Sequence, residues 1–244
     1  RSQPVGTVHP VRLFGLGIVK NEVDVIEQSA RHALRFCDRV LYLDNGSDDG
    51  TWEVLCELQA ETGGRIQAVD RHLGPFHDGL RGLLYDDVRG TLGPDDWWLQ
   101  ADADEFLEAD PRPAIRRAAA LGRNRIRTWQ VQFAFTDRDL EAWEAGREDT
   151  SLPIQERRRW YRADWMESRL WRNDPNRPWG DGTGTHPGWA DRPAPFALVN
   201  RHYQHRDPDQ MQRRIEARRG VFPHVTADSW RQAARQSNGQ GSAR

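Results

Sequence analysis

Short apolar segments that end in polar residues alternate with helical patterns through residues 11–110. Residues 11–19 (VRLFGLGIV) and 40–43 (VLYL) have the uninterrupted apolar character of buried strands, whereas residues 25–36 carry apolar side chains at helical spacing. Regular alternation of strands and helices is typical of a parallel sheet covered by helices on both faces. The sequence therefore predicts an α/β fold.

Local signals place the ends of these elements. Asp24 is a candidate N-cap for the first helix, and Thr51 for a second helix that stops at Gly63. Further strands are expected at 65–69 and from residue 97, and a further helix between residues 75 and 88. Right-handed crossovers align the carboxyl ends of parallel strands, so Asp44 and Asp102, which follow two of them, should face one crevice.

The pattern changes after residue 110, where aromatic residues become frequent in the expected strands. Helices are expected at 113–121, 138–146 and 207–219, strands at 125–135, 156–165, 169–172 and 197–203, and a loop at 173–195. We expect an α/β half over residues 1–110, a second half of the same domain over 111–236 and a disordered polar tail over 237–244.

The charges nearly cancel, with 35 Lys and Arg against 37 Asp and Glu. This balance favours neither a nucleic acid nor an acidic partner. The two cysteines, Cys37 and Cys56, lie in apolar helical patterns and are expected to be buried, which fits a reducing cytoplasm. No apolar run could span a bilayer and no signal peptide is visible, so no transmembrane segment is expected. The sequence gives no indication of the oligomeric state.

The segment 97–107 (WWLQADADEFL) runs from an apolar strand into three carboxylates. Side chains on a strand alternate between faces, so Asp102 and Asp104 are expected to point the same way. Two like charges on one face repel unless a cation lies between them, and carboxylate oxygens suit Mg²⁺ or Mn²⁺. The alternative is a solvated acidic loop. The position after an apolar strand, where open α/β sheets bind ligands, favours the cation site.

Four other polar features each have two interpretations. Asp44 opens the segment 44–51 (DNGSDDGT) and could bind a nucleobase or ribose, or form an Asx-turn. Arg81 could contact a ligand or belong to a solvated helix face. The segment 201–206 (RHYQHR) could complete a metal site or merely pack at an element boundary. The loop 179–189, with four glycines, reads as a mobile lid or as a surface excursion.

Together, three segments resemble glycosyltransferase family 2 in order and spacing: residues 19–22 (VKNE), 43–51 (LDNGSDDGT) and 100–106 (QADADEF). Residues 201–214 (RHYQHRDPDQMQRR) also resemble the C-terminal part of some bacterial members. The resemblance implies a GT-A fold, with a Rossmann-like, mostly parallel central sheet, helices on both faces and a C-terminal acceptor-side region. It also implies a nucleotide-diphosphate sugar as donor and Mn²⁺ or Mg²⁺ as cofactor.

The resemblance assigns roles to individual residues. The nucleotide contacts that it implies come from Asn21, Glu22, Asp44, Arg81 and Asp102, with Asp44 at the nucleobase and Asp102 at the ribose. The metal ligands that it implies are Asp102, Asp104 and His202, with His202 favoured over His205.

Two features depart from the family pattern. Processive members carry Gln-x-x-Arg-Trp, whereas residues 155–160 (QERRRW) are one residue too long, so a processive enzyme is not expected. The carboxylate that acts as catalytic base has no motif of its own here. Asp181 and Glu167 are the candidates, and Asp191 is a third candidate that ranks after them.

The sequence therefore predicts a metal-dependent glycosyltransferase that moves a sugar to an acceptor hydroxyl, with inversion implied by the resemblance alone. The alternatives are a nucleotidyltransferase, an Asp-x-Asp phosphatase and a non-catalytic nucleotide-sugar-binding module. A nucleotidyltransferase should carry a Gly-rich basic loop after the first strand, where this chain has residues 20–22 (KNE). A phosphatase of the Asp-nucleophile type should carry its Asp-x-Asp after the first strand rather than the fourth.

Overall fold

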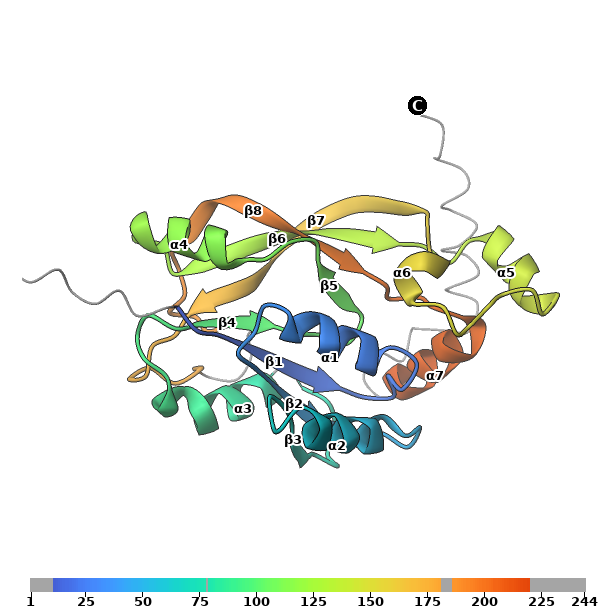
Figure 1. Ribbon diagram of the computed structural model, residues 1–244, viewed down its shortest axis with the longest axis horizontal. Helices are drawn as coiled ribbons and strands as arrows, with labels where there is room; N and C mark the ends of the chain where they lie inside the picture. Colours follow the sequence, from blue (N-terminus) through green and yellow to red (C-terminus); the bar gives the residue numbers. More distant parts are fainter. Residues whose placement is uncertain (1–10, 78, 181–185, 220–244) are drawn as a thin grey trace, which may run out of the picture.

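The computed structural model describes residues 11–77, 79–180 and 186–219 of the 244-residue chain, so the predicted tail at 237–244 lies outside the described residues. Its strands form one sheet in the order β3-β2-β1-β4-β7-β6-β8-β5 (Figure 1). The strands are β1 (Leu13–Val19), β2 (Arg39–Asp44), β3 (Ile66–Arg71), β4 (Trp97–Gln100), β5 (Glu105–Leu107), β6 (Arg125–Phe133), β7 (Tyr161–Arg172) and β8 (Pro193–His202). The helices are α1 (Ile26–Leu34), α2 (Thr51–Glu61), α3 (Leu80–Val88), the 3-10 turn η1 (Arg89–Thr91), α4 (Arg112–Ala120), α5 (Asp137–Glu144), α6 (Ile154–Arg157) and α7 (Pro208–Arg219).

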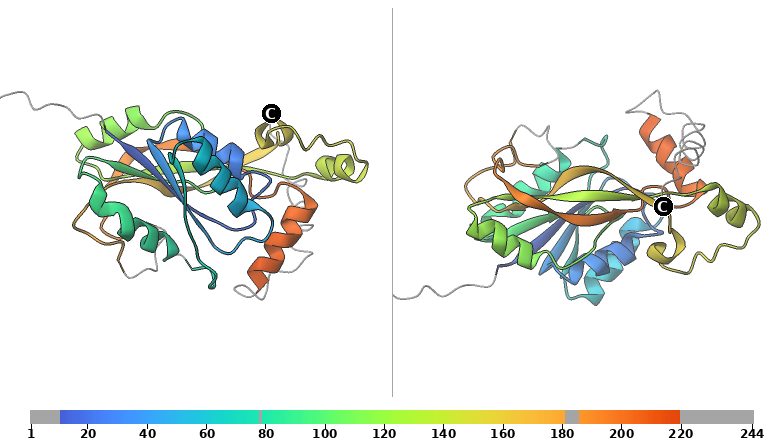
Figure 2. Two further views of the ribbon diagram at one scale, coloured as in Figure 1. Left: turned by 60° about the horizontal axis from the view of Figure 1, so that its bottom comes forward. Right: turned by 90° about the horizontal axis from the view of Figure 1, so that it is seen from above.

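The first half of the chain forms four parallel strands with helices on both faces. Strands β3, β2, β1 and β4 are neighbours and run parallel. Along β2, Val40 and Tyr42 pack into a core that also contains residues of α1 and α2, whereas Leu41 and Leu43 pack into a second core with α3. The helices accordingly lie on opposite sides of this part of the sheet (Figure 2). The predicted α/β class is confirmed.

The second half extends the same sheet with mixed directions. Within the described residues, four of the seven adjacent strand pairs are parallel, and the pairs β4–β7, β7–β6 and β8–β5 are antiparallel. The sheet is therefore mostly parallel, and it is visibly twisted and curled (Figure 2). Strand β5, which sequence patterning did not predict, lies at the far edge beside β8.

One long strand replaces the two strands expected at 156–165 and 169–172. Residues 154–157 form the short helix α6, and β7 then runs without interruption from Tyr161 to Arg172. Two register shifts against β6 lie in this pairing, between Ile126 and Arg127 and between Gln130 and Val131. A bulge absorbs an extra residue without ending the strand, so the polar residues near position 167 mark no break.

Both predicted helix caps were wrong, because these side chains have partners in other parts of the fold. Helix α1 has Val25 at its N-cap without a side-chain cap, and Asp24 Oδ2 instead binds Arg206 Nε at 2.6 Å. Helix α2 has Gly50 at its N-cap with φ 103°, a conformation that favours glycine. Thr51 is the first helical residue, and its Oγ1 accepts a hydrogen bond from the backbone N–H of Glu22 at 2.8 Å.

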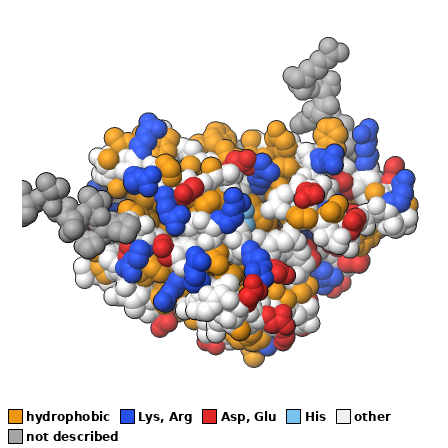
Figure 3. All heavy atoms as spheres, viewed as in Figure 1, with side chains coloured by type: hydrophobic (Ala, Val, Ile, Leu, Met, Phe, Trp, Pro, Cys, Tyr) orange, Lys and Arg blue, Asp and Glu red, His pale blue; other side chains and the backbone are white. Residues whose placement is uncertain are grey.

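The two cysteines differ in burial. Cys37 is buried as expected, whereas Cys56 is exposed, and both are free thiols. Cys56 follows the fully buried Leu55 on α2, and neighbouring helical positions point in different directions. Among the described residues, no helix is long and apolar enough to cross a membrane. On the face shown in Figure 3, basic and acidic side chains are interspersed.

Candidate functional site

The candidate site lies where β1, β2 and β4 end. Asn21 and Glu22 follow β1, Asp44 is the last residue of β2, and Asp102 and Asp104 follow β4. Because β1 pairs in parallel with both β2 and β4, these five residues lie at the same edge of the sheet. This is the edge at which open α/β sheets bind ligands.

The acidic pair does not lie on a strand. Strand β4 ends at Gln100, and Asp102 and Asp104 belong to the turn that joins it to β5. The expectation that these two residues continue a strand was therefore wrong, and strand alternation does not orient their carboxylates. The turn gives each carboxylate its own set of partners.

Asp102 lies between basic side chains from two elements. Arg81 of α3 donates to its Oδ1, the Gln100 side-chain amide donates to its Oδ2 at 2.7 Å, and Arg169 Nη2 of β7 lies 4.0 Å away. Burial raises the pKa of the Asp102 carboxyl, but the guanidinium groups of Arg81 and Arg169 outweigh this effect, and the pKa is lowered overall. Asp102 is therefore an anion held by the site.

Asp104 belongs to a group that could hold a metal ion. Ligand atoms of Asp104, Glu105 and His202 all lie within 4.8 Å of one another. Asp104 Oδ2 lies 3.2 Å from His202 Nε2 and 3.1 Å from Arg214 Nη1 of α7. Burial acts to raise the pKa of Asp104, but His202 and Arg214 bring it well below its usual value. Carboxylate ligands suit Mn²⁺ and Mg²⁺, whereas imidazole is a usual ligand of transition-metal ions.

The orientation of His202 depends on Gln132 of β6. The Gln132 side-chain amide contacts His202 Nδ1, the ring nitrogen opposite the one that faces Asp104. If Gln132 presented its carbonyl oxygen to Nδ1–H, the lone pair of Nε2 would be available to a cation. As placed, the amide nitrogen of Gln132 faces Nδ1, so a divalent ion bound by Asp104 and His202 requires the opposite orientation of this amide and an unprotonated Nε2.

Glu105 has a different environment from the other two acids of this group. It is buried, and it accepts hydrogen bonds from Arg169 Nε at 2.7 Å and from Asn200 Nδ2 at 2.5 Å, both at Oε2. Arg169 Nη2 also binds Oε1. With both oxygens occupied, Glu105 mainly positions Arg169 next to Asp102.

Asp44 is fully buried and has one oxygen without a partner. Its Oδ1 accepts hydrogen bonds from the backbone N–H groups of Gly46 and Ser47 at 2.9 Å each and from Arg71 Nε at 3.2 Å. Its Oδ2 has no hydrogen-bond partner in the described structure. The Asx-turn and a free acceptor therefore coexist, and a buried carboxylate oxygen is costly to leave unpaired.

Asn21 has a strained backbone that joins two of the loops at this edge. Its φ is 57°, in the left-handed region, where Asn is among the better tolerated residues. The Asn21 N–H donates to Ser47 Oγ at 2.9 Å, and its side-chain oxygen accepts from the Asp48 N–H at 3.0 Å. Asn21 thus connects the loop after β1 to the loop after β2.

Glu22 lies in a buried ionic cluster with the C-terminal helix. Arg206 donates to Glu22 and to Asp24, and Arg214 lies 3.9 Å from Glu22 as well as beside Asp104. Burial raises the pKa of Glu22 to about 7, against the opposing effect of Arg206. The start of α7 is therefore attached to the loop after β1 by charge-assisted hydrogen bonds.

The candidates for the catalytic base lie in different parts of the structure. Glu167 of β7 lies 2.5 Å from Arg169, the same arginine that contacts Glu105 and approaches Asp102. Asp191 instead lines a pocket of about 420 Å³ with Pro94, which precedes β4, and thus lies near the opposite end of that strand from Asp102. Asp181 lies outside the described residues.

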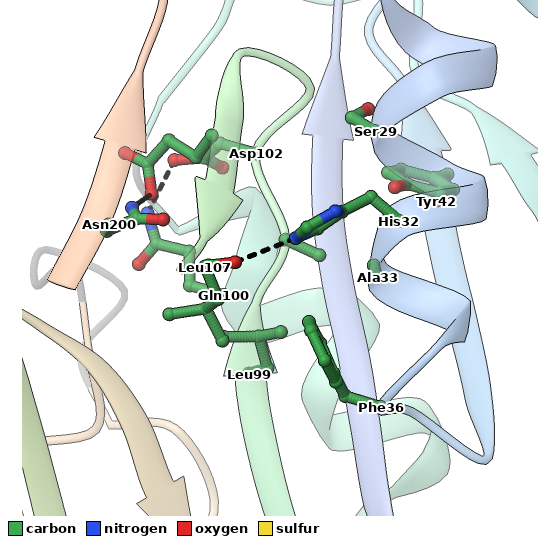
Figure 4. Close-up of a pocket in the computed structure, with 12 residues that line it drawn as sticks. Ser29, His32, Ala33, Phe36, Tyr42, Leu99, Gln100, Asp102, Leu107 and Asn200 are labelled. Carbon is green, nitrogen blue, oxygen red and sulfur yellow. Dashed lines mark hydrogen bonds between the residues drawn. The ribbon is translucent and has the colours of Figure 1, made fainter. Parts of the chain in front are cut away.

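A small cavity lies beneath the acidic turn, with a volume of about 10 Å³. Gln100, Asp102 and Asn200 lie on one side of it, and Ser29 and His32 of α1 lie on the other (Figure 4). Its size matches about one water molecule. It is therefore too small for a nucleotide or a sugar.

Comparisons with known proteins concern the fold. No protein-family model matches the sequence, and no curated protein matches it. The chain is similar in structure to a mannosyltransferase from Pyrobaculum calidifontis in complex with GDP-Man and Mn²⁺, with 12% identity and a TM-score of 0.48, over 97% of this chain and 77% of that chain. It is also similar to a protein named as a glucose-1-phosphate thymidylyltransferase from Bacillus anthracis, with 11% identity and a TM-score of 0.33, over 50% of this chain. The chain spans about half (55%) of the length of that protein.

Sequence reasoning missed four polar residues that contribute to the site. Glu105 was seen only as part of the acidic segment, and Arg169, Arg206 and Arg214 were not singled out. The two arginines of the C-terminal region belong to the segment 201–214, which was noted for its resemblance to the family, and residues 201–206 were also noted as a possible metal site. Arg169 follows no motif, and only the pairing of β7 into the sheet reveals its position.

Proposed function

We propose that this chain transfers a sugar from a nucleotide-diphosphate sugar to an acceptor hydroxyl, with Mn²⁺ or Mg²⁺ as cofactor. The observation that carries the proposal is the approach of Asp104, in the turn after β4, to His202 at the end of β8, beside the ion pair of Asp102 with Arg81. A cation-binding group next to fixed positive charge is what a diphosphate requires.

Each residue of the site has a proposed role in holding the donor. Asp44 would lie at the nucleobase, and its buried Oδ2 has no hydrogen-bond partner among the described residues. Asn21, Glu22 and Arg81 would line the nucleotide, and Asp102 would bind the ribose. Asp104 and His202 would hold the metal ion, which when bound supplies positive charge that stabilises the departing diphosphate. Arg214, 3.1 Å from Asp104, adds a further positive charge at the same place.

The proposed reaction is a direct displacement at the anomeric carbon. A carboxylate removes the proton of the acceptor hydroxyl while the acceptor oxygen forms a bond to the anomeric carbon. The bond from that carbon to the diphosphate oxygen breaks, and the nucleoside diphosphate leaves with the electron pair. Glu167 is the proposed base among the described residues, and Asp181 stays the other candidate. Such a displacement inverts the anomeric configuration.

We also propose that transfer is non-processive and takes place in the cytoplasm. The segment 155–160, which nearly matches the processive motif, has its first three residues in α6, and the side chain of Arg158 contacts Glu148 at 2.8 Å. The free thiols Cys37 and Cys56 fit a reducing compartment.

The proposal is tested by the metal dependence of donor turnover. Purified protein is screened for stabilisation by nucleotide sugars with Mn²⁺, and the best donor is assayed for sugar transfer and slow hydrolysis. Asp104→Ala should lower turnover by about 100-fold, since removal of charge that stabilises the leaving group has effects of this order. Asp95→Ala is the matched control, because its 79% exposed side chain lies before β4, at the other end of the strand. Full turnover by Asp104→Ala in the presence of a chelator would refute the proposal.

The same assay separates the alternative functions. Binding of nucleotide sugar without any turnover would indicate a non-catalytic module. Formation of the nucleotide sugar from a sugar phosphate and a nucleoside triphosphate would indicate a nucleotidyltransferase, and release of inorganic phosphate from a phosphomonoester would indicate a phosphatase.

A further inference from the structure

One tryptophan of the chain is exposed beside the candidate site. Trp97, Trp98, Trp171 and Trp179 have at most 2% of their surface exposed and belong to the core. Trp165 of β7 is 39% exposed. Single exposed apolar side chains are common on protein surfaces, so the exposure of Trp165 gains meaning only from the position of its ring relative to the site.

The pairing of β7 with β6 shows which face of the sheet Trp165 occupies. Trp165 pairs with Gln130, which is fully buried and contacts Asn200, a partner of Glu105. Paired residues of adjacent strands lie on the same face of a sheet. Trp165 is therefore on the face that carries the acidic cluster, as is Glu167, two residues further along β7.

The indole ring is oriented by a hydrogen bond to the proposed base. Trp165 Nε1 donates to Glu167 Oε1 at 2.7 Å, while Glu167 Oε2 lies 2.5 Å from Arg169. The side chain of Glu167 is 38% exposed. The ring is thus fixed next to a carboxylate that is open to solvent and connected through Arg169 to Glu105 and Asp102.

We infer that Trp165 is the platform of an acceptor subsite and that the acceptor is a sugar ring. The C–H face of a pyranose is apolar and can lie on an indole, while its hydroxyl groups reach a neighbouring carboxylate. A ring stacked on Trp165 would present a hydroxyl to Glu167. This inference rests on the proposed function, because it assigns the acceptor side of that reaction.

The test uses a second exposed tryptophan as a matched control. Trp129 of β6 is 42% exposed and pairs with Met166 and Val199, so it lies on the opposite face from Trp165. Binding of methyl α- and β-glycosides of glucose, mannose and galactose is measured by saturation-transfer NMR with nucleoside diphosphate and Mn²⁺ present. Glycerol serves as a hydroxyl compound without a ring.

The expected result is a signal from the ring C–H protons of at least one glycoside with the wild-type protein and with Trp129→Ala. Trp165→Ala should weaken that binding by about tenfold, in line with the energy of aromatic contacts, and Trp165→Phe should restore part of it. A wild-type protein that binds none of the glycosides, or a Trp165→Ala variant that binds them equally well, would overturn the inference.

Thermal stabilisation by nucleoside diphosphate and Mn²⁺, recorded on the same samples, separates the two hypotheses. If nucleoside diphosphate and Mn²⁺ do not raise the melting temperature of the wild-type protein, the proposed donor site is wrong. Normal stabilisation together with unchanged glycoside binding in Trp165→Ala would mean that only the acceptor subsite is wrong.

Discussion

At the scale of single residues, the site is a dense arrangement of buried charges that hold one another. Glu22 shares Arg206 with Asp24, and Arg214 lies between Glu22 and Asp104. Carboxylates this close raise one another's pKa unless a cation separates them. Arg206, just before α7, and Arg214, within α7, supply part of that positive charge, which explains how several buried carboxylates lie close together.

The raised pKa of Glu22 predicts a pH-dependent stability. Burial raises its pKa from 4.5 to about 7, so the folded protein favours the protonated carboxyl. The stability that the wild-type protein retains by keeping Glu22 protonated is fully present below pH 4.5. It is lost as the pH rises towards 7. Glu22→Gln, which stays neutral, should therefore gain up to about 3 kcal/mol of unfolding free energy relative to wild type across this range.

Urea unfolding at several pH values between 4.5 and 7.5 measures this difference, with the exposed Glu57→Gln as the control that should follow the wild-type curve. A Glu22→Gln curve parallel to that of wild type would contradict the raised pKa.

At the scale of elements, the close approach of β1 and β2 depends on a glycine. A Cβ atom built on Gly17 would lie 2.3 Å from the ring of Tyr42 and 2.6 Å from the backbone oxygen of Ala101. Tyr42 is fully buried, and Ala101 directly precedes the acidic turn. The small residue thus lets an aromatic ring fill the space behind β1 and sets the distance from β1 to the turn.

Gly17→Ala should lower the free energy of unfolding by about 1–3 kcal/mol, because overpacking a closed core forces its neighbours to move. It should also weaken Mn²⁺-dependent stabilisation, since Ala101 leads into the acidic turn. Gly90→Ala is the matched control, because a Cβ there meets no atom within 4 Å. Chemical denaturation of the three proteins checks the prediction, and equal stability of Gly17→Ala and wild type would disprove it.

At the scale of the whole molecule, the proposed donor site joins the two halves of the chain. Asp102 and Asp104 come from the first half, whereas Arg169, His202 and Arg214 come from the second. Strand β5 carries the chain directly from the acidic turn to pair with β8, which ends at His202. Binding at this site should therefore stabilise both halves together.

Hydrogen exchange tests this coupling. With nucleoside diphosphate and Mn²⁺, amide protection should rise in the loop after β1 and in the acidic turn, and also at the end of β8 and in α7. Chelation of the metal should reverse the effect in both regions. Protection confined to residues of the first half would show that β8 and α7 do not belong to the donor site.

The parallel half of the fold and the edge at which the site lies follow from sequence patterning alone. The alternation of apolar strands and helices predicted the parallel half, because burial of both faces of each strand leaves a clear signal in the sequence. Polar residues at or near the carboxyl ends of those strands, among them Asp44 and Asp102, marked the edge at which the site lies. Hydrophobic periodicity is a local property, and local properties are visible in a single chain.

The tertiary structure decided what depends on distant partners. Asp24 and Thr51 do not cap their helices with their side chains, because Arg206 and the Glu22 backbone bind them instead. Asp102 and Asp104 lie in a turn because the chain leaves β4 for β5, whose pairing with β8 is a contact across nearly one hundred residues of sequence. Arg169 and Trp165 acquire their positions only through the register of β7 on β6. Such long-range pairings depend on the whole sheet, so no short segment encodes them.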